Sequence, residues 1–161
     1  MKPVRACLAV ASLLLLCVAT SAAAESASGN IVLKRDIGPP NLPLDKRYEQ
    51  MDDTQHALLK ARYAGMGAAD EPPWPSAGMA PLMLALRQGA DAYRVTGQLD
   101  MTVEVGPDGA ARSVSVYEGA GDAQFTKFAA SLLMTTKYKP AVCAGQPCTM
   151  SWPLQLTLSR R

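Results

Sequence analysis

The clearest alternation of hydrophobic and polar residues lies in the C-terminal half of the chain. Over residues 99–105, hydrophobic residues alternate with polar ones, which predicts a half-buried strand. Residues 106–109 read Gly-Pro-Asp-Gly. This composition is typical of a tight turn, because proline fixes φ early in the turn and glycine accepts a positive φ late. The alternation resumes over residues 112–117, so we expect an antiparallel hairpin.

A helix and a closing strand are predicted after the hairpin. Asp122 is a candidate N-cap for an amphipathic helix that runs to about Lys137, and Pro140 prevents its continuation. The last strand is predicted over residues 149–158, where hydrophobic residues alternate with polar residues and one proline. These residues are Met150, Ser151, Trp152, Pro153, Leu154, Gln155, Leu156, Thr157 and Leu158.

The helical pattern between residues 44 and 95 is weaker than the patterns of the C-terminal half. Asp45 can cap a helix that runs to about Ala64, and a second helix is predicted over residues 80–88. Between them, the proline-rich run 70–75 is interpreted as a solvated linker. We expect Trp74 within it to pack onto the domain, with a role in recognition as the alternative.

The order of these elements predicts an α+β fold. Helix, strand, turn, strand, helix, loop and strand follow one another between residues 79 and 161. A three-stranded antiparallel sheet with helices packed on it buries the hydrophobic faces economically.

The N-terminus has the pattern of a cleaved secretory signal. Lys2 and Arg5 precede an uncharged stretch that is rich in leucine, and small residues end at Ala24. The strongly apolar run is shorter than the roughly 20 residues of a spanning helix, so we favour cleavage over a retained anchor. A lipoprotein at Cys17 is less favoured, because Cys17 follows Leu16 rather than a small residue. Residues 1–24 are then the signal, 25–43 a flexible tether, 44–78 an N-terminal helix with a Pro-rich linker, and 79–161 the main domain.

Removal of the signal changes the charge balance and the cysteine count. The full chain has 16 Lys and Arg against 14 Asp and Glu, and cleavage removes two basic residues, which leaves a net charge of zero. A neutral domain lacks the basic surface typical of nucleic-acid binding. Two cysteines remain, Cys143 and Cys148, and in an oxidising compartment a disulfide is favoured over two free thiols or a metal site.

No residue pattern indicates catalysis. His56 lies near Asp52 and Asp53, but no nucleophile motif accompanies them, so we interpret all three as part of an exposed helix face. Phosphate-binding loops, haem attachment motifs and zinc-ligand spacings are absent from the sequence. We therefore expect a protein that is not an enzyme, with no catalytic residue, cofactor or metal.

The ordered set of elements resembles the C-terminal domain of the TonB family. The resemblance covers residues 79–159 at most and is strongest over 96–158. Its features are Gly97, the strand 99–105, Asp108-Gly109, the strand 112–117, the helix 123–137, Tyr138-Lys139-Pro140 and the closing strand 149–158.

The resemblance implies a periplasmic binding or adaptor protein. In the family, the closing strand is a sheet edge that accepts an extended peptide, so Met150 to Thr157 become the candidate partner-binding residues. An envelope protein is the implied partner, with a TonB-dependent outer-membrane receptor as the candidate, and the membrane would be contacted only through an uncleaved signal. Pro153 fits an edge strand but removes one backbone donor. The alternative is a structural or assembly accessory of the envelope in which residues 44–75 close this edge.

Overall fold

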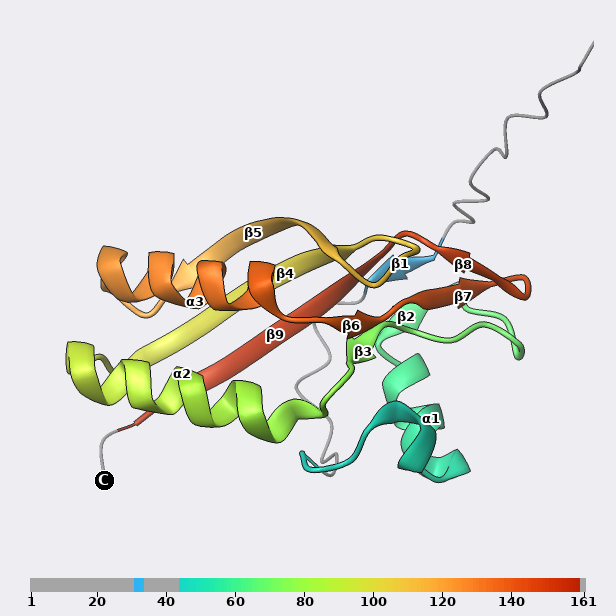
Figure 1. Cartoon of the computed structure of the whole chain (residues 1–161), viewed down its shortest axis with the longest axis horizontal. Helices are drawn as coiled ribbons and strands as arrows, with labels where there is room; N and C mark the ends of the chain where they lie inside the picture. Colours follow the sequence, from blue (N-terminus) through green and yellow to red (C-terminus); the bar gives the residue numbers. More distant parts are fainter. Residues whose placement is uncertain (1–30, 34–43, 160–161) are drawn as a thin grey trace, which may run out of the picture.

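The protein has an α+β fold built on a three-stranded antiparallel sheet (Figure 1). The computed structural model describes residues 31–33 and 44–159, so the predicted signal peptide and most of the predicted tether lie outside the described residues. In the sheet, β4 (Gly97–Val105) lies between β5 (Ala111–Gly119) and β9 (Met150–Leu158). All three strands were predicted from the alternation of hydrophobic residues.

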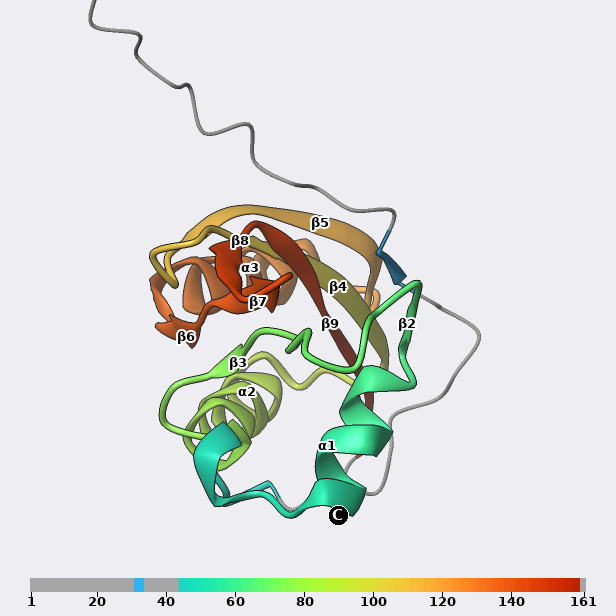
Figure 2. The ribbon, with the colours of Figure 1, turned by 90° about the vertical axis from the view of Figure 1, so that its right-hand side faces the viewer.

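Two helices, α2 (Met79–Tyr93) and α3 (Ala123–Thr135), cover one face of the sheet (Figure 2). The backbone N–H of Phe125 donates to the Asp122 side chain at 2.6 Å, as expected of an N-cap. The α2 helix extends beyond the predicted 80–88 to Tyr93, and its C-cap, Arg94, has a left-handed conformation (φ 55°). Between the helices and the sheet lies the centre of the core, whose fully buried members include Leu86, Leu99, Met101, Val103, Val105, Phe125 and Leu133.

The predicted continuous helix from Asp45 to Ala64 is wrong. A single 3-10 turn, η1 (Tyr48–Gln50), is followed by extended backbone, and only then does α1 (Asp53–Lys60) begin. The cause is a capping box at Asp52: the N–H of Gln55 donates to the Asp52 carboxylate at 2.9 Å, and the N–H of Asp52 donates to the Gln55 side chain at 3.1 Å. Asp52 therefore starts the helix instead of lying in its middle.

Two residues of the predicted tether form a strand. Strand β1 (Val32–Leu33) pairs antiparallel with β2 (Tyr63–Ala64), which follows α1.

The proline-rich run 70–75 is not a solvated linker, and this prediction is also wrong. Within it, β3 (Trp74–Pro75) pairs with β6 (Tyr138–Lys139), and the backbones of Glu71 and Val142 exchange two hydrogen bonds of 2.9 Å. All its prolines, Pro72, Pro73 and Pro75, are buried. Tertiary pairing with residues 137–142 therefore turns a segment with weak local preferences into a layer of the core.

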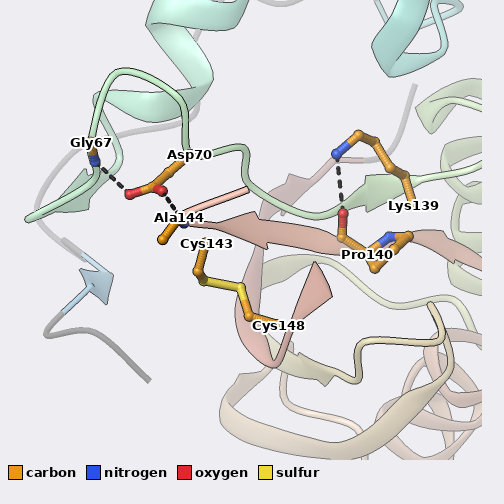
Figure 3. Close-up of a disulfide and its surroundings, with 7 residues drawn as sticks. All are labelled: Gly67, Asp70, Lys139, Pro140, Cys143, Ala144 and Cys148. Atoms are coloured by element: carbon orange, nitrogen blue, oxygen red, sulfur yellow. Dashed lines mark hydrogen bonds between the residues drawn. A yellow bond between two sulfur atoms is a disulfide. The ribbon is translucent and has the colours of Figure 1, made fainter. Parts of the chain in front are cut away.

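A short disulfide-linked hairpin follows β6 (Figure 3). Strands β7 (Ala141–Cys143) and β8 (Gln146–Cys148) pair, and a disulfide joins Cys143 to Cys148, whose Cα atoms are 5.8 Å apart. The Asp70 side chain accepts hydrogen bonds from the backbone N–H of Ala144 at 2.8 Å and of Gly67 at 2.6 Å, and these lower the pKa of its carboxyl. Asp70 thus connects the segment after β2 to the tip of the hairpin.

None of the helices in the described part of the chain has the length and apolar character needed to cross a membrane.

Candidate functional site

Strand β9 forms one edge of the central sheet. Among the described strands it pairs only with β4, and the register is unbroken from Gly97 opposite Leu158 to Val105 opposite Met150. Alternate side chains face the core, and Trp152 and Leu154 are almost fully buried there. The predicted edge residues thus lie on an edge strand, with their hydrophobic members turned toward α2 and α3.

Pro153 indicates which backbone groups of β9 point outward. In an antiparallel pair, residues that exchange hydrogen bonds alternate with residues that do not. Pro153 lies opposite Thr102 within the continuous register, and a proline fits there only where the missing N–H would point away from the neighbour. Every second residue of the strand has the same orientation as Pro153. The N–H and C=O groups of Ser151, Gln155 and Thr157 therefore also point away from β4.

The segment after α1 covers one end of this edge. The Tyr63 hydroxyl donates a hydrogen bond of 2.9 Å to the carbonyl oxygen of Ser151, which agrees with an outward direction for that carbonyl. Tyr63 is buried, and this burial raises the pKa of its hydroxyl well above the ordinary value, so it stays a donor at physiological pH. Residues 44–75 therefore reach the Ser151 end of β9.

Beyond Ser151, two adjoining cavities follow β9 along α2, and we call them together the edge groove. The first has a volume of about 260 Å³ and the second of about 210 Å³. Both are lined by Met83, Leu156 and Thr157, which makes them neighbours. Other residues around the first cavity are Leu44, Arg62, Trp74, Met79, Trp152, Pro153, Leu154 and Gln155.

Two tryptophans, Trp74 and Trp152, line the first cavity of the edge groove and are held in place by contacts with the fold. Trp74 is buried and its indole N–H donates to the Lys46 carbonyl at 3.2 Å, so it packs onto the domain as the sequence predicts. Trp152 packs against the ring of Tyr138, with 5.5 Å between the centroids. Both indoles are held by the fold, so this part of the edge groove is preformed.

Arg62 supplies the edge groove with a buried cation. Only 7% of its surface is exposed. One Nη donates to the Gln155 side chain at 3.1 Å, and the amide of Gln155 donates in turn to the Asp100 carboxylate at 3.4 Å. Burial lowers the pKa of Arg62, and the proximity of Tyr63 and Asp100 opposes this effect. Its Nε–H has no hydrogen-bond partner among the described residues.

Sequence reasoning missed Arg62. The residue follows α1 and carries no motif, so only its burial against β9 distinguishes it from other arginines.

His56 and Asp52, the residues considered for catalysis, each make contacts within the fold. His56 was expected on an exposed face, but it is partly buried: its ring stacks on Tyr48 at 4.4 Å, and Nε2 lies 2.9 Å from the Tyr48 carbonyl oxygen. Asp52 serves as a helix cap. These contacts give both residues structural roles.

The disulfide lies at the other end of β9 from the edge groove. Cys143 and Cys148 share a small buried cluster with Met150, Tyr63 and Ala141. The bridge therefore supports the strand from its Met150 end and does not line the edge groove.

The fold and the edge groove define an α+β protein with a candidate peptide-binding edge. In comparisons with models of protein families, with characterised proteins and with solved structures, no significant match to this chain was found.

Proposed function

We propose that this chain is a non-enzymatic binding or adaptor protein of the periplasm, and that it engages an extended segment of an envelope protein through β9. The observation that carries the proposal is the edge groove. It lies beside β9, and the position of Pro153 indicates which peptide groups of β9 point outward. An added strand gains affinity from backbone hydrogen bonds and selectivity from pockets for alternate side chains. The TonB-like order of elements and the N-terminal signal pattern support the same proposal, with a TonB-dependent outer-membrane receptor as the candidate partner.

The contact would be shorter than the sequence suggested. Tyr63 already bonds the Ser151 carbonyl, and Pro153 has no N–H to offer. An added strand would therefore use the outward peptide groups of Gln155 and Thr157, next to the edge groove, rather than the whole stretch from Met150 to Thr157.

Amide exchange tests this mode of binding. The mature chain, beginning at Glu25, is used to recover a partner from envelope extract, and exchange is then compared with and without that partner. We expect slower exchange over residues 154–158. Protection that is confined to residues 44–75 would show that the N-terminal segment is the working surface instead.

A backbone variant at the edge separates strand addition from side-chain contact. Thr157→Pro removes one outward N–H while its side chain is exposed, and Thr157→Ala is the matched control that keeps the N–H. One hydrogen bond is worth about 0.5–1.5 kcal/mol, so we expect Thr157→Pro to weaken binding roughly twofold to tenfold and Thr157→Ala to change it little. Equal effects of the two variants would contradict pairing at this position.

A second candidate function is favoured by the Tyr63–Ser151 hydrogen bond alone. If residues 44–75 serve to close the edge, the protein is a structural or assembly accessory of the envelope with no peptide bound at β9. In that case Tyr63→Phe would cost stability, by about 1 kcal/mol, without changing the affinity for any partner.

A further inference from the structure

The two walls of the edge groove differ in chemistry. Met79 and Met83 of α2 form one wall, on the side of the sheet to which Trp152 and Leu154 point. On the other wall lies Arg62, hydrogen-bonded to Gln155, whose side chain faces away from the core. A strand added beside β9 would present alternate side chains to the two walls, because successive side chains of a strand point to opposite faces.

Arg62 has unused hydrogen-bonding capacity. A guanidinium carries five N–H donors in a planar fork, yet among the described residues Arg62 donates only to Gln155 and makes no ion pair. A buried donor without a partner is costly and calls for an explanation. The Nε–H together with a neighbouring Nη–H matches the two oxygens of a carboxylate.

The volume of the first cavity limits what the apolar wall can take. Small-molecule sites usually enclose about 300–1,000 Å³. At about 260 Å³, and with methionine and tryptophan around it, this cavity suits one or two bulky apolar side chains rather than a whole cofactor.

We infer that the edge groove selects extended segments in which an acidic side chain lies between two bulky apolar ones, with Arg62 receiving the carboxylate and the α2 wall receiving the apolar side chains. This inference rests on the proposed function, since it assumes a strand beside β9. It adds the class of ligand: a segment of alternating apolar and acidic residues.

Synthetic peptides test the inference directly. Three capped, fluorescein-labelled peptides share the sequence Thr-Leu-X-Leu-X-Leu-Thr, with X as Glu, Gln or Lys, and their binding to the mature chain is measured by fluorescence anisotropy. We expect the Glu peptide to bind about tenfold more tightly than the Gln peptide, because hydrogen bonds to charged groups are the stronger ones, and the Lys peptide to bind most weakly.

Substitution of the arginine provides the second arm. Arg62→Gln should remove the preference for Glu over Gln, and Arg62→Lys, which keeps the charge but loses the fork, should reduce it. Arg47→Gln is the matched control, because Arg47 is an exposed cation in the same N-terminal segment and does not line the edge groove. Amide exchange of β4 in each variant checks that the sheet is intact.

The outcomes separate this inference from the proposed function. Equal binding of the Glu and Lys peptides, with protection of β9, would overturn the role of Arg62 and leave strand addition standing. A preference for Glu that persists in Arg62→Gln would overturn it as well. Decanoate, a small amphipathic acid, is the competing probe. If it binds in the first cavity and displaces the Glu peptide, and amide exchange of β9 is not slowed, then the site binds small amphipathic acids. Both the inference and the strand-addition proposal then fail.

Discussion

Gly109 lies in the tight turn between β4 and β5 and contacts Tyr138, in the segment that follows α3. Gly109 has a φ of 74°, which glycine adopts without strain. Its carbonyl accepts the N–H of Tyr138 at 3.0 Å, and a Cβ at this position would collide with the carbonyl oxygen of Tyr138. The sequence predicted the turn from its composition, but the close approach to Tyr138 is visible only in the folded chain.

A pair of glycine variants separates these two effects. Gly121 has the same φ of 74°, but a Cβ at Gly121 would meet no atom within 4 Å, so Gly121→Ala should cost only the left-handed backbone strain, about 1–2 kcal/mol. Gly109→Ala adds a steric clash, and we expect a further loss of about 1–3 kcal/mol. Urea unfolding of both variants measures the difference. Equal losses would mean that Tyr138 moves aside freely.

At the scale of elements, the β7–β8 hairpin is attached to the molecule by more than its disulfide. Glu71 pairs with Val142 through the backbone, and its carboxylate lies 2.7 Å from the Lys139 ammonium group. Asp70 accepts a hydrogen bond from the hairpin tip at Ala144. Apart from the covalent bridge, backbone pairing and a side-chain hydrogen bond hold the hairpin itself, and the Glu71–Lys139 ion pair holds the strand just before it.

Removal of the disulfide should therefore weaken the protein without unfolding it. On the loop-entropy model a bridge this short stabilises by about 2 kcal/mol, so replacing Cys143 and Cys148 together by serine should lower the free energy of unfolding by up to that amount. Thiol titration of a chain that begins at Glu25 should find no free thiol before reduction and two after it. Free thiols in protein taken from an oxidising compartment would contradict the bridge.

At the scale of the whole molecule, the N-terminal segment 44–78 and the region from α2 onward share one core. Tyr48, Met51, Leu59 and Trp74 are buried in the same cluster as the residues of α2, α3 and the sheet. In addition, Lys139 lies 4.3 Å from the ring centroid of Tyr48, a cation–π contact between the two parts. Residues 44–78 are therefore a structural part of the unit to which the β9 edge belongs.

Truncation measures how much this segment contributes. Removing one large buried side chain typically costs about 2–5 kcal/mol, and four such losses match or exceed the usual 5–15 kcal/mol of total stability. A chain that begins at Met79 should therefore fail to fold, whereas one that begins at Leu44 keeps the four residues and should fold. Near-ultraviolet circular dichroism and cooperative urea unfolding distinguish the two. A folded, cooperative chain from Met79 would show that the sheet and its two helices are self-sufficient.

Local signals explain which elements could be predicted. The three strands of the sheet show alternation over seven or more residues, or sit beside a turn of clear composition, and α3 has a cap at Asp122 and amphipathic spacing. The N-terminal helix was placed too early, because Asp45 and Asp52 both fit a cap and only Asp52 has Gln55 three residues later to complete the box. The full length of α2 was missed, since its last turns carry no strong hydrophobic pattern.

The sequence by itself determined the three long strands of the sheet, the hairpin turn and the cap of α3, because each depends on residues that are neighbours along the chain. Only the tertiary structure decided what happens to the proline-rich run 70–75 and to Arg62, since their partners lie far away in sequence: Val142 and Lys139 for the run, Gln155 for the arginine. Long-range pairing of this kind depends on how faces pack together, and the edge groove is formed by such packing.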